Sequence, residues 1–463
     1  MAQAEGTLVA QLVQEMRSRI AARRLVAGTR LPSIRTLAEA RKISKTTVVE
    51  AYDRLAAEGI IQSRRGSGFY VAGHLPPLSL ADTGPKLDRA VDPLWVSRQS
   101  LETADNTLKP GCGWLPPSWM PEASLRRALR GLARSEAVAL TDYGNPLGLA
   151  PLREHLARRL AGFGVPAAPG QILLTESGTH AVDLLCRFLL EPGDTVLVDD
   201  PCYFNFRALL RAHRVRVVSV PYTPTGPDVA AFAQVLVAEK PRLYITNAAV
   251  HNPTGASLSA LTAHRVLKLA EQHDLIIIED DIFADFEVEP SPRLAAFDGL
   301  ERVVQIGSFS KTLSASLRCG YIAARADWIE GLTDLKIATS FAGGRLSAEL
   351  LLAVLQDGTY RKHVESLRPR LASAMSQAGA RLRDVGLTPW VEPRAGLFLW
   401  CELPNGLDAA DIARRAMAEN IVLAPGNVFS PAQTAGRFLR FNVAQCADAS
   451  IFKLLRHATR RVE

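Results

Sequence analysis

The sequence contains no uninterrupted apolar run approaching about 18 residues, and its N-terminus lacks the basic, apolar and small-residue segments of a signal peptide. We therefore expect neither a membrane-spanning helix nor secretion. The six cysteines are scattered without a Cys-x-x-Cys spacing, which argues against a metal site or a disulfide framework and is typical of the reduced cytoplasm. Charged residues make up 22% of the chain, which argues against extensive disorder, and we find neither internal repeats nor low-complexity tracts.

The chain has 463 residues, of which 48% are hydrophobic, enough for two or three globular domains. Its positive charge is unevenly placed. The first 75 residues hold 12 Lys and Arg against 6 Asp and Glu, a net charge of +6 out of +7 for the whole chain. This distribution indicates an anionic polymer as the partner of the N-terminal part, although an ordinary basic surface explains the charge alone equally well.

Three helices are expected in the first 60 residues. Thr7 can cap an amphipathic helix over residues 8–24. Ser33 opens a short helix in PSIRTLAEA, and Ser44 starts a longer one that Gly59 ends. Two helices joined by a short turn form a helix-turn-helix plan. The segment that follows, IIQSRRGSGFYVAG, is typical of a hairpin or wing.

The phrases GTRLPSIRTLAEA, SKTTVVEAYDRLAAEGI and SRRGSGFYV resemble the winged helix-turn-helix head of the GntR regulator family. The resemblance implies a DNA-binding domain over residues 1–73, in which residues 44–58 form the recognition helix. The side chains that it assigns to phosphates or base edges are Arg35, Lys45, Thr46 and Thr47, and those that it places at the wing near the minor groove are Arg64, Arg65 and Gly66.

Residues 74–106 lose periodicity and gather Pro, Asp and Ser, which predicts a linker. Residues 107–463 alternate helical stretches with the apolar runs QILLT, TVLVDD, VRVVSVP, RLYITNAA, LIIIEDD, VVQIGSFS and RCGYIAA. This alternation predicts an α/β domain with a largely parallel sheet covered on both faces. A long helix over residues 346–386 then leads to a smaller α+β end with the strands GLFLWCEL and RFLRFNV.

Lys311 is the central candidate, because it directly follows an apolar strand in IGSFSKTLSASLRCGY. A lone lysine is usually surface charge. At a strand end, however, partial burial can lower its pKa so that the amine forms a Schiff base. Arg318, seven residues later, can turn back to bind a phosphate, and Ser308 and Ser310 supply hydroxyls.

Other polar residues follow the predicted strands. Asn252, in AAVHNPTGASLS, offers an amide on a rigid turn, and Asp280 ends LIIIED, where a carboxylate can keep a pyridine nitrogen protonated. The segment Ser177, Gly178 and Thr179 passes from a strand into a helix and exposes N–H groups to a phosphate. Tyr203 offers an aromatic face for stacking on a planar ring.

Together these residues resemble the fold-type I, class I aminotransferases, which use pyridoxal 5'-phosphate, over about residues 108–463. The resemblance implies that Lys311 forms the Schiff base, that Asp280 pairs with the pyridine nitrogen, that Asn252 donates to the ring phenolate oxygen and that Tyr203 stacks on the ring. The phosphate cradle that it implies consists of Ser177, Gly178, Thr179, Ser308, Ser310 and Arg318.

Two further residues and one departure follow from the same resemblance. The segment DYGNPLGLAPLREHL matches a family motif in which Tyr143 reaches the phosphate of the neighbouring subunit of a homodimer. Arg440, in GRFLRFNVA, stands where the family binds a substrate α-carboxylate, although a structural role is the alternative. The family usually has tyrosine where Phe283 stands, and the missing phenol should alter the proton affinity of the cofactor linkage and slow turnover.

A GntR-type head followed by an aminotransferase-like body resembles the MocR subgroup of bacterial regulators over essentially the whole chain. The resemblance implies a head-to-tail homodimer that binds double-stranded operator DNA. We therefore expect a pyridoxal-phosphate-dependent transcription regulator that senses an amino compound or the cofactor itself. The alternatives are an active aminotransferase with an accessory DNA-binding head, and a scaffold that binds no cofactor.

Overall fold

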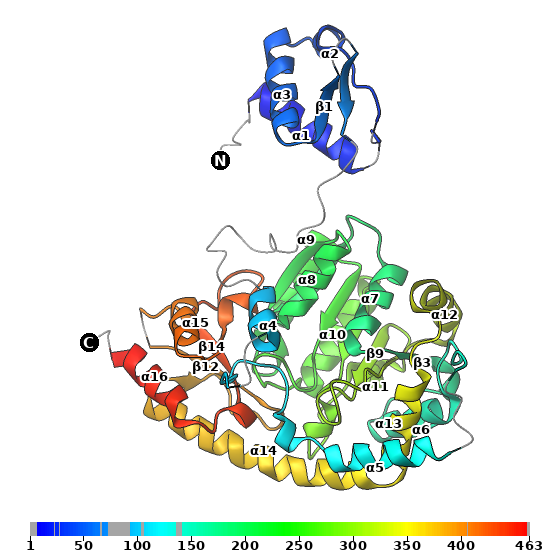
Figure 1. Cartoon of the computed structure of the whole chain (residues 1–463), viewed down its shortest axis with the longest axis vertical. Helices are drawn as coiled ribbons and strands as arrows, with labels where there is room; N and C mark the ends of the chain where they lie inside the picture. The colour runs from blue at the N-terminus through cyan, green and yellow to red at the C-terminus, as the bar shows by residue number, and fades with distance from the viewer. Residues whose placement is uncertain are drawn as a thin grey trace. The chain divides into compact units, whose positions relative to one another are not determined.

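The protein consists of two compact parts, which we call the head (residues 1–79) and the body (residues 80–463) (Figure 1). A computed structural model describes residues 7–22, 24–26, 28–64, 67–72, 93–102, 106–135, 141–404 and 406–460, with Arg64 and Pro93 described by their backbone alone. Among the helices in these ranges, none combines the length and apolar character needed to cross a membrane.

The head has the predicted winged helix-turn-helix architecture, with α1 (Leu8–Ala21), α2 (Ile34–Arg41), α3 (Lys45–Ala57) and an antiparallel hairpin of β1 (Ile61–Arg64) and β2 (Gly68–Val71). Each helix begins at the expected hydroxyl residue. The side chains of Thr7, Ser33 and Ser44 accept hydrogen bonds from backbone N–H groups in the first turns of their helices, which satisfies donors that have no intrahelical partner.

The core of the head forms where α3 packs on α1, α2 and the hairpin. Tyr52 of α3 is fully buried, donates a hydrogen bond to the Pro32 carbonyl at 3.0 Å and packs edge-on against Phe69 of β2. On α1, Leu8 is 58% exposed, whereas the next residue, Val9, lies in the core. The recognition helix α3 is therefore anchored by one face and leaves the other face free for a partner.

The body contains an eight-stranded sheet in the order β3-β10-β9-β8-β7-β4-β5-β6. Strands β5, β4, β7, β8 and β9 are parallel, while β10 runs antiparallel to β3 and β9, and β6 runs antiparallel to β5. Their bounds are β3 (Ile172–Thr175), β4 (Thr195–Asp200), β5 (Arg216–Thr223), β6 (Gly226–Pro227), β7 (Leu243–Thr246), β8 (Ile276–Asp280), β9 (Val303–Ser308) and β10 (Gly320–Ala323). The predicted largely parallel sheet is confirmed.

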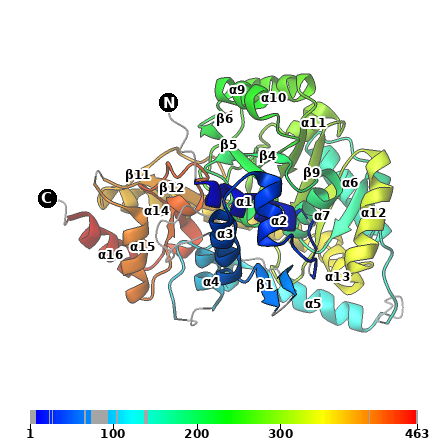
Figure 2. The ribbon, with the colours of Figure 1, turned by 90° about the horizontal axis from the view of Figure 1, so that it is seen from above.

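Helices cover both faces of this sheet. Successive residues of a strand point into two separate hydrophobic cores, one on each face of the sheet, as Ile277 and Ile278 of β8 do. Because both faces are buried, the strands are continuous apolar runs in the sequence. The helices are α6 (Ala150–Gly162), α7 (Gly178–Leu189), α8 (Phe204–Ala212), α9 (Val229–Glu239), α10 (Ala260–Gln272), α11 (Leu294–Asp298) and α12 (Ala326–Ser340). Helix α9 packs along β5 and α12 along β3, so the two lie toward opposite edges of the sheet (Figure 2).

A smaller C-terminal lobe of the body holds an antiparallel sheet in the order β11-β12-β14-β13. Its strands are β11 (Thr388–Pro389), β12 (Phe398–Glu402), β13 (Ala424–Pro425) and β14 (Phe438–Asn442). Further helices of the body are α5 (Glu122–Ala133), α13 (Arg345–Gln356), α14 (Thr359–Asp384), α15 (Ala409–Ala418) and α16 (Ala449–Thr459). The prediction of one long helix over 346–386 is wrong, because Gly358, with a φ of +74°, separates α13 from α14.

The predicted linker, 74–106, also differs from the structure. Residues 93–102 form α4 (Pro93–Glu102), which packs on the body through Val96, only 2% exposed and in one cluster with Phe204 and Phe429. The helix is therefore stabilised by partners more than 100 residues away, which the local sequence does not reveal. The remainder of the segment, residues 74–92 and 103–105, lies outside the described residues.

Candidate functional site

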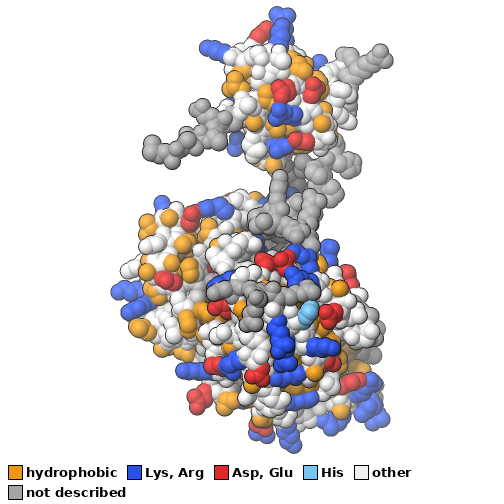
Figure 3. Space-filling model, turned by 90° about the vertical axis from the view of Figure 1, so that its left-hand side faces the viewer, with side chains coloured by type: hydrophobic (Ala, Val, Ile, Leu, Met, Phe, Trp, Pro, Cys, Tyr) orange, Lys and Arg blue, Asp and Glu red, His pale blue; other side chains and the backbone are white. Residues whose placement is uncertain are grey.

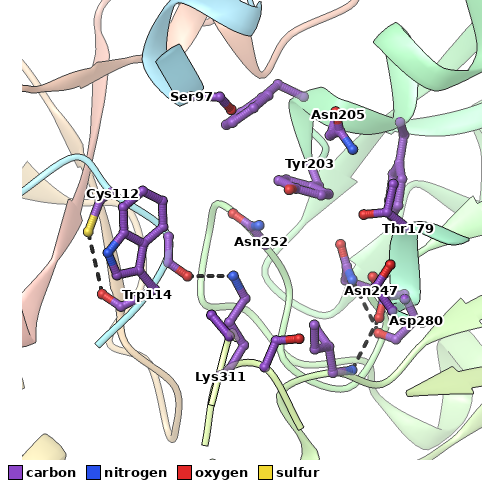
Figure 4. Close-up of a pocket in the computed structure, with 18 of the residues that line it drawn as sticks. Ser97, Cys112, Trp114, Thr179, Tyr203, Asn205, Asn247, Asn252, Asp280 and Lys311 are labelled. Atoms are coloured by element: carbon purple, nitrogen blue, oxygen red, sulfur yellow. Dashed lines mark hydrogen bonds between the residues drawn. The ribbon is translucent and has the colours of Figure 1, made fainter. Parts of the chain in front are cut away.

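One cavity of about 420 Å³ in the body brings together most of the residues that the sequence singles out. It opens where β7, β8 and β9 end, the edge at which parallel sheets commonly bind ligands. Figure 4 shows Lys311, Asn252 and Asp280 facing this space. The predicted residues that line the cavity are Ser177, Gly178, Thr179, Tyr203, Asn252, Asp280, Ser310, Lys311, Arg318 and Arg440.

Lys311 follows β9 and carries an amine suited to covalent chemistry. Its Nζ donates a hydrogen bond to the Gly113 carbonyl at 2.6 Å. Burial, and secondarily the positive charge of Arg440, lowers the pKa of Lys311 to about 8. A larger fraction of the amine is therefore neutral, and hence nucleophilic, near neutral pH than in an exposed lysine.

Asp280 is the last residue of β8 and is 8% exposed. Burial raises the pKa of this carboxyl to about 6, while hydrogen bonds from Asn247 and the Ile282 N–H oppose the shift. Among the described residues, Asp280 has no ion-pair partner. A protonated pyridine nitrogen would supply the missing positive charge. Asn247 was not predicted from the sequence, although its position directly after β7 indicates that it lies at the same sheet edge as the other site residues.

The N-terminus of α7 forms the predicted phosphate end of the cavity. Ser177 caps the helix by accepting a hydrogen bond from the His180 N–H at 3.0 Å, and the first-turn N–H groups have no intrahelical acceptor. Gly320 of β10 makes this geometry possible, since a Cβ there would lie 2.8 Å from the Ser177 carbonyl carbon. Arg318 lines the same cavity and has no ion pair with any described residue.

Of three further residues named from the sequence, two lie outside the cavity lining and one lies within it. Ser308 does not line the cavity; its hydroxyl donates to the Cys319 carbonyl at 3.2 Å and lies 2.7 Å from the Ser310 hydroxyl, so it positions Ser310. Tyr143 is 79% exposed and stacks on Phe341 outside the cavity. Phe283 lines the cavity and packs edge-on against Phe398.

Arg440 of β14 is 1% exposed and its guanidinium lies between the rings of Phe398 and Phe429, 4.2 and 4.6 Å from their centroids. It donates to the Asn252 Oδ1 at 2.8 Å and to the Gly111 carbonyl at 2.7 Å, both neutral acceptors, and its Nε has no partner in the described ranges. Burial lowers the pKa of Arg440 to about 10. No carboxylate pairs with it among the residues that the structure describes.

The donor set fits pyridoxal phosphate. Around one space the cavity places an amine of lowered pKa, a buried carboxylate that has no counter-ion among the described residues, the N-terminus of a helix and an aromatic ring. Because Asn252 accepts from Arg440 through Oδ1, its Nδ2 remains available to donate to a ring oxygen.

The candidate DNA contacts lie on the head. Lys45 and Thr46 are exposed at the start of α3, whereas Thr47 lies 2.8 Å from the Ser44 hydroxyl within the cap. Arg35 is exposed and pairs with Glu39 at 2.9 Å, a surface pair that contributes little stability. Figure 3 shows side chains of both charges on the face of the head that is turned to the viewer. The Arg64 side chain, Arg65 and Gly66 lie outside the described residues.

Comparison with known proteins agrees with this geometry. Residues 108–457 match the family model of aminotransferase class I and II, and residues 8–71 match that of the bacterial regulatory proteins, gntR family. The HTH-type transcriptional regulator YdcR of Escherichia coli K12 is 30% identical over 94% of both chains. The chain belongs to the MocR subgroup of the GntR family.

Two further relatives support both halves of this regulator. The HTH-type transcriptional regulator NorG of Staphylococcus aureus is 26% identical over 86% of this chain and 92% of its own. The α-aminoadipate aminotransferase LysN of Thermus thermophilus, solved with N-(5'-phosphopyridoxyl)-L-leucine, superposes with a TM-score of 0.71 and 28% identity over 79% of this chain and 95% of its own. The protein is a DNA-binding transcription regulator whose cofactor is pyridoxal phosphate.

Proposed function

We propose that the regulator senses an amino acid, which binds in the body beside the cofactor and changes the affinity of the head for operator DNA. The observation that carries this proposal is Arg440, a fully buried cation that lines the cavity and has only neutral partners among the described residues. An unpaired buried charge is costly, and the carboxylate of an amino acid would supply the counter-charge in a bidentate geometry.

Arg293, which is buried, and Arg159, which is partly buried, show the contrast. Arg293 pairs with both Asp281 and Glu287, and Arg159 pairs with Asp285 at 2.5 Å. These arginines serve the fold, because their charges are balanced within the chain. Arg440 differs from them both in lining the cavity and in lacking an acidic partner within the described part of the chain, which supports a ligand rather than a structural role.

The other residues of the cavity hold the cofactor in this proposal. When bound, pyridoxal phosphate supplies an amine-reactive aldehyde and an electron-withdrawing ring. Lys311 would hold it covalently, Asp280 would pair with the pyridine nitrogen, Asn252 would donate to the ring oxygen and Tyr203 would cover one face. Residues 177–179, Ser310 and Arg318 would bind its phosphate. Arg440 would orient the carboxylate of an amino effector.

We further propose a head-to-tail homodimer in the cytoplasm, with Tyr143 completing the partner's phosphate site. The exposure of Tyr143, and its place outside its own chain's cavity, support this role. A second candidate function is transamination, because the residues expected to serve it, Lys311 and Asp280, line the cavity together. Sustained turnover of amino acids with an oxo acid, on the order of 1 per second or more, would favour that function.

The proposal is tested by spectral titration of Arg440→Ala with a panel of amino acids, alongside DNA binding. Loss of a desolvated, charge-assisted contact should weaken effector binding by roughly 30-fold or more, equivalent to about 2–5 kcal/mol. Binding of the cofactor should barely change, since the residues that would hold its phosphate lie at the N-terminus of α7 and not at Arg440. Arg437→Ala, an exposed neighbour paired with Glu402, is the matched control and should bind the effector as the wild type does.

One outcome would contradict the proposal that an amino acid is the signal. If no amino acid perturbs the spectrum or the DNA affinity of the wild type, while the cofactor alone changes its DNA affinity, pyridoxal phosphate is itself the signal. The same result in Arg440→Ala would show that Arg440 plays no part in sensing.

A further inference from the structure

Helix α4, the first described helix of the body after the head, contributes one wall of the cofactor cavity. Val96 anchors the helix in the body, while Ser97, Ser100 and Leu101 line the cavity together with it. Ser97 lies three and four positions before Ser100 and Leu101, so the three side chains share one face of the helix. This wall of the cavity is therefore formed by one face of the helix and not by a single side chain.

Ser100 provides a second, independent observation. It is 2% exposed, and its hydroxyl has no hydrogen-bond partner within the described part of the chain. A buried hydroxyl without a partner is unfavourable, and in a cavity lining it is satisfied when a ligand offers a polar group. Leu101, by contrast, lines the same cavity but is 72% exposed, so the cavity reaches solvent beside α4.

The chemistry of this end of the cavity differs from that of the cofactor end. Helices α4 and α8 contribute apolar side chains, the hydroxyls of Ser97 and Ser100 and the amide of Asn205, none of them charged. The charged lining residues are those already given roles with the cofactor or the carboxylate. Figure 4 shows Ser97 and Asn205 toward α4 and α8, away from Lys311 and Asp280.

We propose that Ser97 and Ser100 form a subsite for the uncharged, hydrogen-bonding end of the effector's side chain. The ligand class is an amino acid with a hydroxyl or carboxamide group, because a carboxylate or ammonium placed beside the buried Ser100 would lie away from the solvent-exposed Leu101 and have no counter-ion among the described lining residues of α4 and α8. This inference rests on the proposed function, because it deepens the amino-acid site next to Arg440.

Ligand binding at the subsite also affects the part of the chain that leads to the head. A ligand that bonds to both the cofactor end and α4 stabilises the docked position of α4. In the chain, α4 follows the segment that connects the body to the head. Occupancy of the subsite therefore acts on the point at which that connecting segment joins the body.

The test uses the full-length, cofactor-loaded protein and two pairs of similarly shaped amino acids. L-threonine is compared with L-valine, and L-glutamine with L-glutamate, by cofactor absorbance and by DNA affinity. We expect the uncharged polar member of at least one pair to bind at least about 5-fold more tightly than its counterpart. In Ser97→Ala/Ser100→Ala this preference should fall below about 2-fold, since two hydrogen bonds are lost.

Two further variants keep the result interpretable. Arg98→Ala changes an exposed residue of α4 that does not line the cavity and should retain the preference, and Ser97→Thr should retain it because the hydroxyl remains. Alanine favours helix, so α4 should persist in the double variant, and unchanged cofactor absorbance verifies the fold.

The outcomes separate the subsite from the proposed function. If amino acids change the spectrum and DNA affinity, but the double variant shows the same preferences as the wild type or L-glutamate binds best, the subsite is wrong and the sensing proposal stands. If no amino acid binds the wild type, both the sensing proposal and the subsite proposal are wrong.

Discussion

Lys311 and Arg440 are two cations that approach each other in one buried site. A Cβ built on Gly113 would lie 3.7 Å from the Lys311 Nζ and 3.9 Å from the Arg440 guanidinium, so both side chains converge on one backbone segment. Each charge disfavours the other, and the positive charge of Arg440 contributes to the lowered pKa of Lys311. A carboxylate beside Arg440 would offset this repulsion, which links effector binding to the amine that holds the cofactor.

The lowered pKa of Lys311 predicts the pH dependence of cofactor uptake. The neutral amine reacts, so the rate at which apo-protein takes up pyridoxal phosphate should rise with pH to a midpoint of about 8, the pKa given by burial. Arg440→Ala should move the midpoint upward, because a neighbouring positive charge is removed. The rate is measured from visible absorbance, with Lys311→Ala as the control that forms no borohydride-reducible adduct. A wild-type midpoint near 10.5 would contradict the burial argument.

Much of the site could be predicted from the sequence, because parallel strands end at one edge of a sheet. That rule alone brings Lys311, Asp280 and Asn252 together. It does not reveal Gly113, whose carbonyl bonds to Lys311 across 198 residues of sequence, or the neutral partners of Arg440. Those contacts depend on how the C-terminal lobe and the segment before α5 pack, which no local pattern encodes.

Among the elements, the starts of helices and the positions of strands could be predicted from neighbouring residues, whereas α4 could not. Hydroxyl caps fix the starts of α2 and α3, and apolar runs fix the strands, because both depend on neighbouring residues. Helix α4 depends instead on Val96 packing against Phe204 and Phe429, residues distant in the sequence. The break between α13 and α14 has a local signal in Gly358 itself, which the prediction of one long helix overlooked.

The N-terminus of α3 carries the prediction for DNA binding. Lys45 is exposed there and has no hydrogen bond or ion pair with a described residue, so Lys45→Ala should weaken DNA binding without disturbing the core of the head. One lost phosphate contact should flatten the slope of log affinity against log salt by about 0.9. Arg35→Ala should act in the same direction.

Salt-dependent fluorescence anisotropy with operator DNA measures both variants. Lys240→Ala, an exposed-surface lysine of the body at the end of α9, serves as the matched control. Cofactor absorbance should be the same in all three proteins, because the cofactor site lies in the body. Wild-type affinity and slope in both head variants would show that another surface binds DNA.

At the scale of the whole molecule, the dimer proposal predicts complementation between two defective chains. Tyr143→Ala should weaken cofactor binding at least about 10-fold, since a hydrogen bond to a charged phosphate is lost. Lys311→Ala should form no covalent adduct. Mixed and re-equilibrated, the two variants should form heterodimers in which one site has both residues. Random re-pairing of equal amounts makes half of the dimers heterodimers, so cofactor titration of the mixture should recover about one quarter of the wild-type tight sites. Recovery of none would contradict a shared site.

The central claim is that occupancy of the cavity in the body controls DNA binding by the head. It is tested most directly by selecting operator fragments from the source genome and titrating them with the cofactor-loaded protein, with and without an amino acid that perturbs its spectrum. We expect a change in operator affinity of about 5-fold or more, a typical coupling, and we expect no such change in Arg440→Ala. Equal operator affinity for the apo, cofactor-loaded and amino-acid-bound wild type would contradict it.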